Sequence, residues 1–285
     1  YEISACLVGS EMCIRDSINV VPEIEMPGHA LAALASYPEL SFDSTQTYKV
    51  SPTWGVFEQV FCPSETTFKF FEGVMDEVVE LFPSEYIHIG GDECPKTAWK
   101  NSAFCQQLIR QLGLKDDVTP SKVDGVKHSK EDKLQSYFVT RMEKYLNDKG
   151  RNIIGWDEIL EGGLAPNATV MSWRGVEGGL NAAKAGHNAI MTPMPYAYLD
   201  FYQEDPAIAP TTIGGYTTLK KTYSYNPAPD DADELVKKHV IGMQGNIWRE
   251  YMKNSDRTDY QAFPRAMAIA ETGWTLDANI MAGRD

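Results

Sequence analysis

The chain is poor in positive charge and in cysteine, and it has no long apolar run. Lys and Arg number 26 against 40 Asp and Glu, giving a net charge of −14. With a pI near 4.8, nucleic acid and anionic membranes are unfavourable main partners, because both would repel this surface. No stretch approaches the roughly 18–20 apolar residues that span a bilayer. Hydrophobic residues make up 43% of the 285 positions, which excludes disordered, collagen-like and coiled-coil chains.

Cysteine and histidine spacing predicts neither a metal site nor a disulfide framework. Beyond residue 17 there are three cysteines, Cys62, Cys94 and Cys105, and no CxxC pair. We expect small buried thiols, of which at most one pair could form a bridge. HxH and HExxH motifs are also missing, so no metal ion and no cofactor is predicted.

The first 17 residues differ from the rest of the chain. They hold two of the five cysteines and show no clear periodicity. Within them, LVGSEMCIRDS (residues 7–17) resembles a translated transposase sequencing adapter. We therefore expect residues 1–17 to be an artefact and residues 18–285 to be the native domain. A native N-terminal strand is the alternative.

Short strands alternate with helices along the chain. Strands are predicted at residues 18–25, 86–91, 152–156, 168–173 and 189–192, and within 237–247. Apolar residues at helical spacing predict helices at residues 66–81, 133–149, 178–185 and 263–273. This alternation indicates parallel βαβ units and an α/β fold.

Three connections interrupt the pattern. Residues 41–65 and 193–233 are rich in aromatic side chains and are predicted to be long loops with a functional role. Residues 114–132 are polar and charged, and we expect a solvated surface insertion there.

Acids and tryptophans gather where the predicted strands end. The residues at these ends are Glu23, Glu25, His29, Asp92, Glu93, Trp156, Asp157, Glu158, Trp173, Arg174, Trp248 and Glu250. In parallel barrels and doubly wound sheets, the carboxyl ends of the strands form the site. Carboxylates beside tryptophan suit a sugar, because indole covers the apolar face of the ring while acids hold hydroxyls and transfer protons.

The most informative stretch is HIGGDE, residues 88–93. Two glycines permit a tight turn after a strand, and two adjacent acids follow. Repulsion between the acids should raise the pKa of one of them, which keeps a general acid protonated near neutral pH. An exposed turn or a helix N-cap is the alternative for Asp92 and Glu93.

Six motifs occur in an order that resembles the catalytic barrel of the family 20 β-N-acetylhexosaminidases, over about residues 18–275. They are PEIEMPGH (22–29), HIGGDE (88–93), GWDEI (155–159), VMSWRG (170–175), YLDFY (198–202) and NIWREYM (246–252). The resemblance implies a (β/α)8 TIM barrel, incomplete here, with about the third to eighth strands present. Because an open barrel has exposed strand edges, we expect this chain alone to fold poorly or to be inactive.

The resemblance also implies a mechanism. Glu93 would protonate the glycosidic oxygen and later deprotonate water, while Asp92 would orient the 2-acetamido group of the substrate. The acetamido carbonyl oxygen would be the nucleophile, giving an oxazolinium intermediate and retention of configuration. The implied substrate is a terminal N-acetylhexosamine on a glycan or chitooligosaccharide.

Further residues are assigned to substrate binding by the same resemblance. Trp156, Trp173 and Trp248 would wall the acetamido pocket. Tyr198 would hydrogen-bond the attacking oxygen, and Asp200 and Glu250 would hold hydroxyls around O4 and O6. His29 would support the acid, and the family implies a periplasmic, cell-surface or secreted enzyme of a bacterium.

Two other functions stay open at this point. A retaining β-glycosidase with two carboxylates could pair Glu93 with Glu158 or Glu250 and would not need an acetamido group. A relative that binds carbohydrate without cleaving it is the third possibility, although binding alone does not require an adjacent acidic pair.

Overall fold

The computed structural model describes residues 18–274, which fall into two compact units. Within the described residues, unit 1 comprises 18–121 and 126–168, and unit 2 comprises 122–125 and 169–274. The expectation that residues 1–17 are an artefact concerns a segment outside the described residues.

Two parallel strands, β1 (Tyr86–His88) and β2 (Asn152–Trp156), form the centre of unit 1. Residues 22–26 run alongside β1, where the Ile24 and Met26 N–H groups donate to carbonyls of β1 and the residue after it. The predicted strand at residues 18–25 is therefore reduced to an extended segment with one bridge residue, Glu23. Prolines at both ends of this segment lack the N–H that a longer ladder needs.

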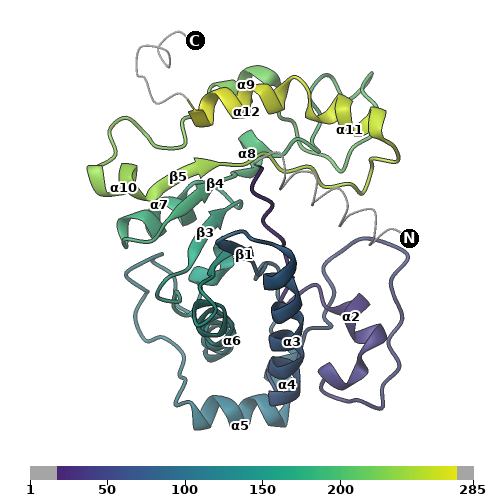
Figure 1. Cartoon of the computed structure of the whole chain (residues 1–285), viewed down its shortest axis with the longest axis vertical. Helices are drawn as coiled ribbons and strands as arrows, with labels where there is room; N and C mark the ends of the chain where they lie inside the picture. The colour runs from purple at the N-terminus through teal and green to yellow at the C-terminus, as the bar shows by residue number, and fades with distance from the viewer. Residues whose placement is uncertain (1–17, 275–285) are drawn as a thin grey trace. The chain divides into compact units, whose positions relative to one another are not determined.

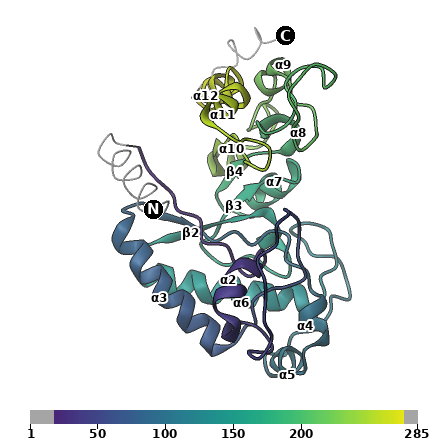
Figure 2. The same ribbon diagram turned by 90° about the vertical axis from the view of Figure 1, so that its right-hand side faces the viewer.

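Helices α3 (Glu65–Leu81) and α6 (Lys130–Asn147) pack against each other in unit 1 (Figure 2). The rings of Phe68 and Phe138 lie 4.7 Å apart at the centre of this contact. Both helices were predicted from apolar periodicity, and burial of these phenylalanines accounts for their stability more than helix propensity does.

Helix α6 begins three residues before the predicted start at Lys133. Ser129 and Asp132 form a capping box, in which the Ser129 side chain accepts from the Asp132 N–H and the Asp132 carboxylate accepts from the Ser129 N–H. This exchange satisfies two N–H groups that a helix start leaves unpaired. The end of the predicted surface insertion at residues 114–132 is thus the first turn of a helix.

Short helices complete unit 1: α2 (Leu31–Ser36), η1 (Pro38–Leu40), α4 (Thr97–Asn101), α5 (Ala103–Gln111) and η2 (Asp157–Leu160). Helices α4 and α5 were not predicted. Trp99 of α4 is fully buried, and its indole N–H donates to the Phe61 carbonyl at 3.1 Å. This bond fixes one end of the long connection at residues 41–65 to the core.

The cysteines at positions 62, 94 and 105 are free and buried, as predicted for small core thiols. The thiols of Cys62 and Cys105 hydrogen-bond to each other, which together with burial raises the pKa of Cys62. Burial raises the pKa of Cys94 to about 12. The thiols of Cys62 and Cys94 are therefore protonated and unreactive at neutral pH.

Unit 2 contains three parallel strands, β3 (Thr169–Ser172), β4 (Ala189–Met191) and β5 (Val240–Met243), paired in chain order (Figure 1). Helix α7 (Glu177–Lys184) connects β3 to β4 and packs on both. Such strand–helix–strand crossovers are the parallel βαβ units that the sequence predicts.

The remaining helices of unit 2 are α8 (Met194–Ala197), α9 (Leu219–Tyr223), α10 (Glu234–His239), α11 (Ser255–Ala262) and α12 (Arg265–Trp274). Two of them lie within residues 193–233, so the prediction of an unstructured loop there was wrong. Arg265, the first residue of α12, holds this connection in place. Its fully buried guanidinium donates to the carbonyls of Leu199, Phe201 and Thr217.

Across residues 18–274, no helix combines the length and the apolar character that crossing a bilayer requires.

Candidate active site

The Gly90–Gly91 turn follows β1 and is held from three directions. His88 Nδ1 accepts from the Gly90 N–H at 3.0 Å, and Glu25 Oε1 accepts from the Gly91 N–H at 3.0 Å. Gln135 of α6 donates its amide to the Gly91 carbonyl at 2.7 Å. Both glycines have positive φ, 68° and 95°, which other residues rarely adopt. The turn therefore presents the two acids that follow it in one fixed geometry.

Replacing Gly90 by Ala should cost more stability than the backbone conformation alone explains. A Cβ at Gly90 would overlap the Glu25 carboxylate, whereas Gly113 has nearly the same φ, 67°, and open space around it. We expect Gly113→Ala to lower the free energy of unfolding by about 1 kcal/mol. Gly90→Ala should lower it by about 2–4 kcal/mol, since overpacking adds to the strain.

Urea unfolding of both variants, in the full-length product of the source gene, measures this difference. Equal losses for the two alanine variants would contradict the close packing of Glu25 against Gly90.

His29 lies between the two adjacent acids. Its Nε2 is 3.4 Å from Asp92 Oδ2 and 3.4 Å from Glu93 Oε2. The hydrogen bond with Asp92 raises the pKa of His29 above its usual value, against the opposing effect of burial. The Glu93 side chain is 37% exposed, so a ligand in solution can reach it. The structure thus brings together three of the predicted site residues.

Backbone strain coincides with these residues. His29 and Glu93 both have φ of 44°, and they are the two non-glycine residues with positive φ in the described part of the chain. This conformation costs of order 1–3 kcal/mol at each position and persists only where the surroundings enforce it. Strain of this kind concentrates at functional sites, which supports the assignment of this turn as the candidate site.

A raised pKa occurs at Glu25, which lies next to the Asp92–Glu93 pair, whereas the pKa of Asp92 is lowered. Burial, followed by the negative charge of Asp92, raises the pKa of Glu25 well above its usual value. Burial alone would also raise the pKa of Asp92, but hydrogen bonds from His29 and Glu25 outweigh it and lower that pKa. His29 compensates the charge of the adjacent acids, and Glu25 has no such counterion.

Trp156 joins this cluster through Glu23. Its indole N–H donates to Glu23 Oε1 at 2.9 Å, and its ring lies 4.8 Å from the ring of His88. The tryptophan is only 3% exposed. Glu23, Glu25 and Gln135 therefore shape the site. Glu23 and Glu25 were predicted to lie at a strand end without an individual role, and Gln135 was not predicted.

In unit 2, the predicted binding residues Trp173 and Tyr198 are neighbours. Their rings stack at 6.3 Å with an interplanar angle of 28°. A bridge between Tyr198 and Asn246 fixes the tyrosine backbone, and the Leu199 N–H donates to the Asn246 carbonyl at 2.8 Å. The result is a rigid aromatic pair after β3 and β4.

Asp200 is buried close to the charge of the exposed Glu250. Burial, with a further contribution from Glu250, raises the pKa of Asp200 to about 7, and Arg265 opposes the shift. Asp200 Oδ1 is buried without a donor among the described residues. Trp248, two residues before Glu250, is 38% exposed, so part of its side chain is accessible.

The raised pKa of Asp200 makes stability depend on pH. The native state keeps the proton up to about pH 7, whereas the unfolded chain loses it near pH 3.8, so stability falls as the pH rises through this window. Asp200→Asn should remove this loss, which amounts to about 4 kcal/mol between pH 4 and pH 8. In thermal unfolding, the Tm of Asp200→Asn relative to that of the wild type should therefore increase as the pH rises.

Asp231→Asn, at an exposed aspartate of the same connection, is the matched control and should show no such trend. A difference between Asp200→Asn and wild type that stays constant from pH 4 to pH 8 would contradict the raised pKa.

Two groups of side chains have donor atoms within 4.8 Å of one another, as a metal site would require. They are His29 with Asp92 and Glu93, and Glu23 with Glu25 and Asp92. Carboxylates can ligate hard cations. Here, however, His29 pairs with both acids and Glu25 hydrogen-bonds to Asp92. Because these internal contacts already use the groups, we assign no metal ligand.

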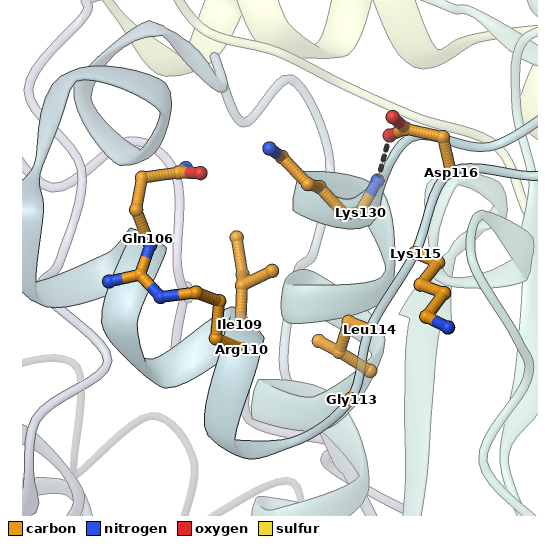
Figure 3. A pocket seen from close by; sticks show the side chains of 8 residues that line it. All are labelled: Gln106, Ile109, Arg110, Gly113, Leu114, Lys115, Asp116 and Lys130. Atoms are coloured by element: carbon orange, nitrogen blue, oxygen red, sulfur yellow. Dashed lines mark hydrogen bonds between the residues drawn. The ribbon is translucent and has the colours of Figure 1, made fainter.

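A surface pocket elsewhere in unit 1 shares no residue with this cluster (Figure 3). It lies between α5 and the start of α6, and it is lined by Gln106, Ile109, Arg110, Gly113, Leu114, Lys115, Asp116 and Lys130. Asp116 accepts from the Lys130 N–H at 2.8 Å at its rim. The lining holds neither a strained residue nor an acidic pair, so the turn after β1 is the better candidate site.

Comparison with known proteins decides the family. Residues 13–277 match the model of the glycosyl hydrolase family 20 catalytic domain. The chain belongs to glycosyl hydrolase family 20. The family resemblance drawn from the six motifs is thereby confirmed.

Family 20 proteins of known name and structure are similar over nearly the whole chain. A β-hexosaminidase of Porphyromonas gingivalis is 50% identical over 260 residues, covering 90% of this chain and 32% of the relative. A β-hexosaminidase of Vibrio furnissii is 35% identical, covering 93% of this chain and 41% of the relative. The chain thus spans about a third to two fifths of these two relatives.

A solved family 20 structure supports the fold. The exo-β-N-acetylglucosaminidase of Vibrio harveyi in complex with N-acetylglucosamine matches with a TM-score of 0.74 at 31% identity, over 94% of this chain and 41% of that one. Family 20 catalytic domains are TIM barrels, so the predicted fold class, α/β with part of a (β/α)8 barrel, is confirmed. The parallel strands of both units agree with it.

Proposed function

We propose that this chain belongs to an exo-acting β-N-acetylhexosaminidase, which removes terminal β-linked GlcNAc or GalNAc from glycans or chitooligosaccharides. The observation that carries the proposal is the Asp92–Glu93 pair on a fixed turn, with one histidine facing both carboxylates. Family 20 membership supports the same activity. No part of the reaction requires a metal ion or cofactor.

Glu93 is the proposed general acid and base. It is the more exposed of the two acids and therefore the one that a glycosidic oxygen reaches first. It would donate its proton as the bond to the leaving group breaks, and then take a proton from the water that opens the intermediate. His29 would shift its hydrogen bond between the two carboxylates as the charge on Glu93 changes.

Asp92 is proposed to act on the 2-acetamido group of the substrate. An amide oxygen is a weak nucleophile, so it needs a fixed trajectory and a nearby negative charge while the oxazolinium forms. Hydrogen bonds lower the pKa of Asp92, which keeps the carboxylate ionised for this task. The product of this step is a cyclic oxazolinium with the leaving group released as an alcohol.

The remaining predicted residues are proposed to bind the sugar. Trp156, Trp173 and Trp248 would surround the acetamido group and exclude water that competes with the amide. Tyr198 would donate to the attacking oxygen. Asp200 and Glu250 would hold hydroxyls near O4 and O6, and these roles follow from the family resemblance. A periplasmic, cell-surface or secreted location in a bacterium also stays a prediction.

Hydrolysis of the nitrophenyl β-glycosides of GlcNAc and of glucose tests the proposal. Because the chain covers a minor part of its relatives, the assay uses the full-length product of the source gene. We expect release from the GlcNAc substrate alone, blocked by a thiazoline mimic of the oxazolinium. Comparable release from the glucoside would favour a two-carboxylate glycosidase, although the candidate nucleophile Glu158 is 7% exposed. Release from neither, by folded protein, would favour carbohydrate binding without catalysis.

A further inference from the structure

One oxygen of Asp92 lacks a hydrogen-bond donor. Asp92 Oδ2 faces His29, but Oδ1 is buried, and among the described side chains the neighbouring Glu25 carboxyl is the group that can donate to it. Leaving a buried carboxylate oxygen without a hydrogen bond is energetically unfavourable. Because Oδ1 is buried, a donor from within the protein is the best placed to satisfy it.

Glu25 is the group placed to supply this donor. The carboxylate oxygens of Glu25, Asp92 and Glu23 lie within 4.8 Å of one another. Glu25 Oε1 is already used, because it accepts from the Gly91 N–H at 3.0 Å. The second oxygen is packed against Gly90, where the missing Cβ makes room for the carboxyl group.

An ionised Glu25 would be unfavourable in this position. It would place a negative charge beside those of Asp92 and the exposed Glu23, at a position where His29 faces Asp92 and not Glu25. Protonation of Glu25 removes one of these charges and makes its second oxygen a hydrogen-bond donor. A single proton then neutralises Glu25 and supplies a donor to Asp92 Oδ1. Burial and the Asp92 charge raise the pKa of Glu25 in agreement with this state.

We propose that Glu25 is a positioning residue for the reaction, a neutral carboxylic acid that donates a hydrogen bond to the buried oxygen of Asp92 and fixes the direction of its other oxygen. The proposal rests on the proposed hexosaminidase function. It deepens that function, because it assigns the orientation of the acetamido group to a pair of acids. Glu25 acts through Asp92 and does not touch the substrate.

Two replacements separate this role from an effect on folding. Glu25→Gln keeps the shape, accepts from the Gly91 N–H and donates its amide to Asp92. Glu25→Met fills similar space but can neither accept nor donate. We expect Glu25→Gln to retain kcat within about threefold of wild type, and Glu25→Met to lose about 10–100-fold with a smaller change in KM, as for other groups that orient a catalytic residue.

The inhibition constant of the thiazoline is the decisive readout, because a misfolded fraction lowers the rate without changing this constant. Glu25→Met should raise it about tenfold or more, while Glu25→Gln should leave it within about threefold. Glu77→Gln and Glu77→Met, at an exposed position of α3, are the matched controls and should change neither value. Equal losses for Glu25→Gln and Glu25→Met would overturn the proposal, since they would mean that an ionised carboxylate is required.

A second measurement does not depend on activity. In the infrared difference spectrum of wild type minus Glu25→Gln at pH 6.5, we expect the carbonyl band of a protonated carboxylic acid. The bands of all other acids are common to both proteins and cancel in the subtraction. A carboxylate band in its place would overturn the proposal. If this band is present but the wild type cleaves no GlcNAc glycoside, the proposed function fails while the protonated Glu25 stands.

Discussion

Replacing Glu93 by Gln is expected to lower kcat on a nitrophenyl β-GlcNAc substrate by about 10²–10⁴-fold, with KM within a few-fold of wild type. Glutamine matches glutamate in size and keeps one oxygen near His29, so the strained turn and the binding groups should persist. What disappears is the proton that the leaving oxygen needs. Steady-state kinetics on matched preparations of both proteins measures the effect.

The dependence on the leaving group identifies the role of Glu93. A dinitrophenolate departs without protonation, so the loss in Glu93→Gln should be much smaller on the dinitrophenyl glycoside than on a disaccharide. Glu77→Gln removes an exposed carboxylate of α3 and should leave both substrates unaffected. A loss of the same size on every leaving group would show that Glu93 is not the general acid.

Asp92→Asn should lower kcat by about 10²–10³-fold, the effect of removing one charged group that stabilises the transition state. The positive charge of the forming oxazolinium would then face a neutral amide, and the amide could turn its N–H₂ toward His29. Binding of the thiazoline should weaken together with kcat, because this inhibitor carries the same ring. Kinetics and inhibition constants on the GlcNAc substrate measure both quantities.

Asp231→Asn, at an exposed position, is the control for the loss of one aspartate charge and should match wild type. If Asp92→Asn lowers kcat but binds the thiazoline as tightly as wild type, Asp92 does not contact the acetamido group, and its assigned role is wrong.

The longer elements could be predicted because their periodicity is sustained. Helix α3 matches its predicted bounds within one residue, since apolar side chains recur at helical spacing over 17 residues. Helices α4 and α5 were missed because they have only 5 and 9 residues, and tertiary burial of Trp99 and Cys105 stabilises them. Periodicity cannot detect an element that depends on distant partners.

The part of the site whose residues are adjacent in sequence could be predicted. The contacts made by residues distant in sequence could not. The two glycines and two acids at residues 90–93 are consecutive, so the sequence alone predicts a turn followed by an acidic pair. Glu25 reaches this turn from 66 residues away, and Gln135 reaches it from 44 residues away. Which acid keeps a proton depends on burial and on the position of His29, and both are properties of the folded chain.

The most direct test of the account is the hydrolysis rate of nitrophenyl β-glycosides whose 2-acetamido group carries zero, one, two or three fluorine atoms. Fluorine withdraws electrons from the amide oxygen and makes it a poorer nucleophile, while the leaving group stays the same. If the acetamido group attacks with the help of Asp92, kcat should fall with each added fluorine. A rate that does not depend on fluorine would mean that a protein carboxylate is the nucleophile and would contradict the substrate-assisted mechanism.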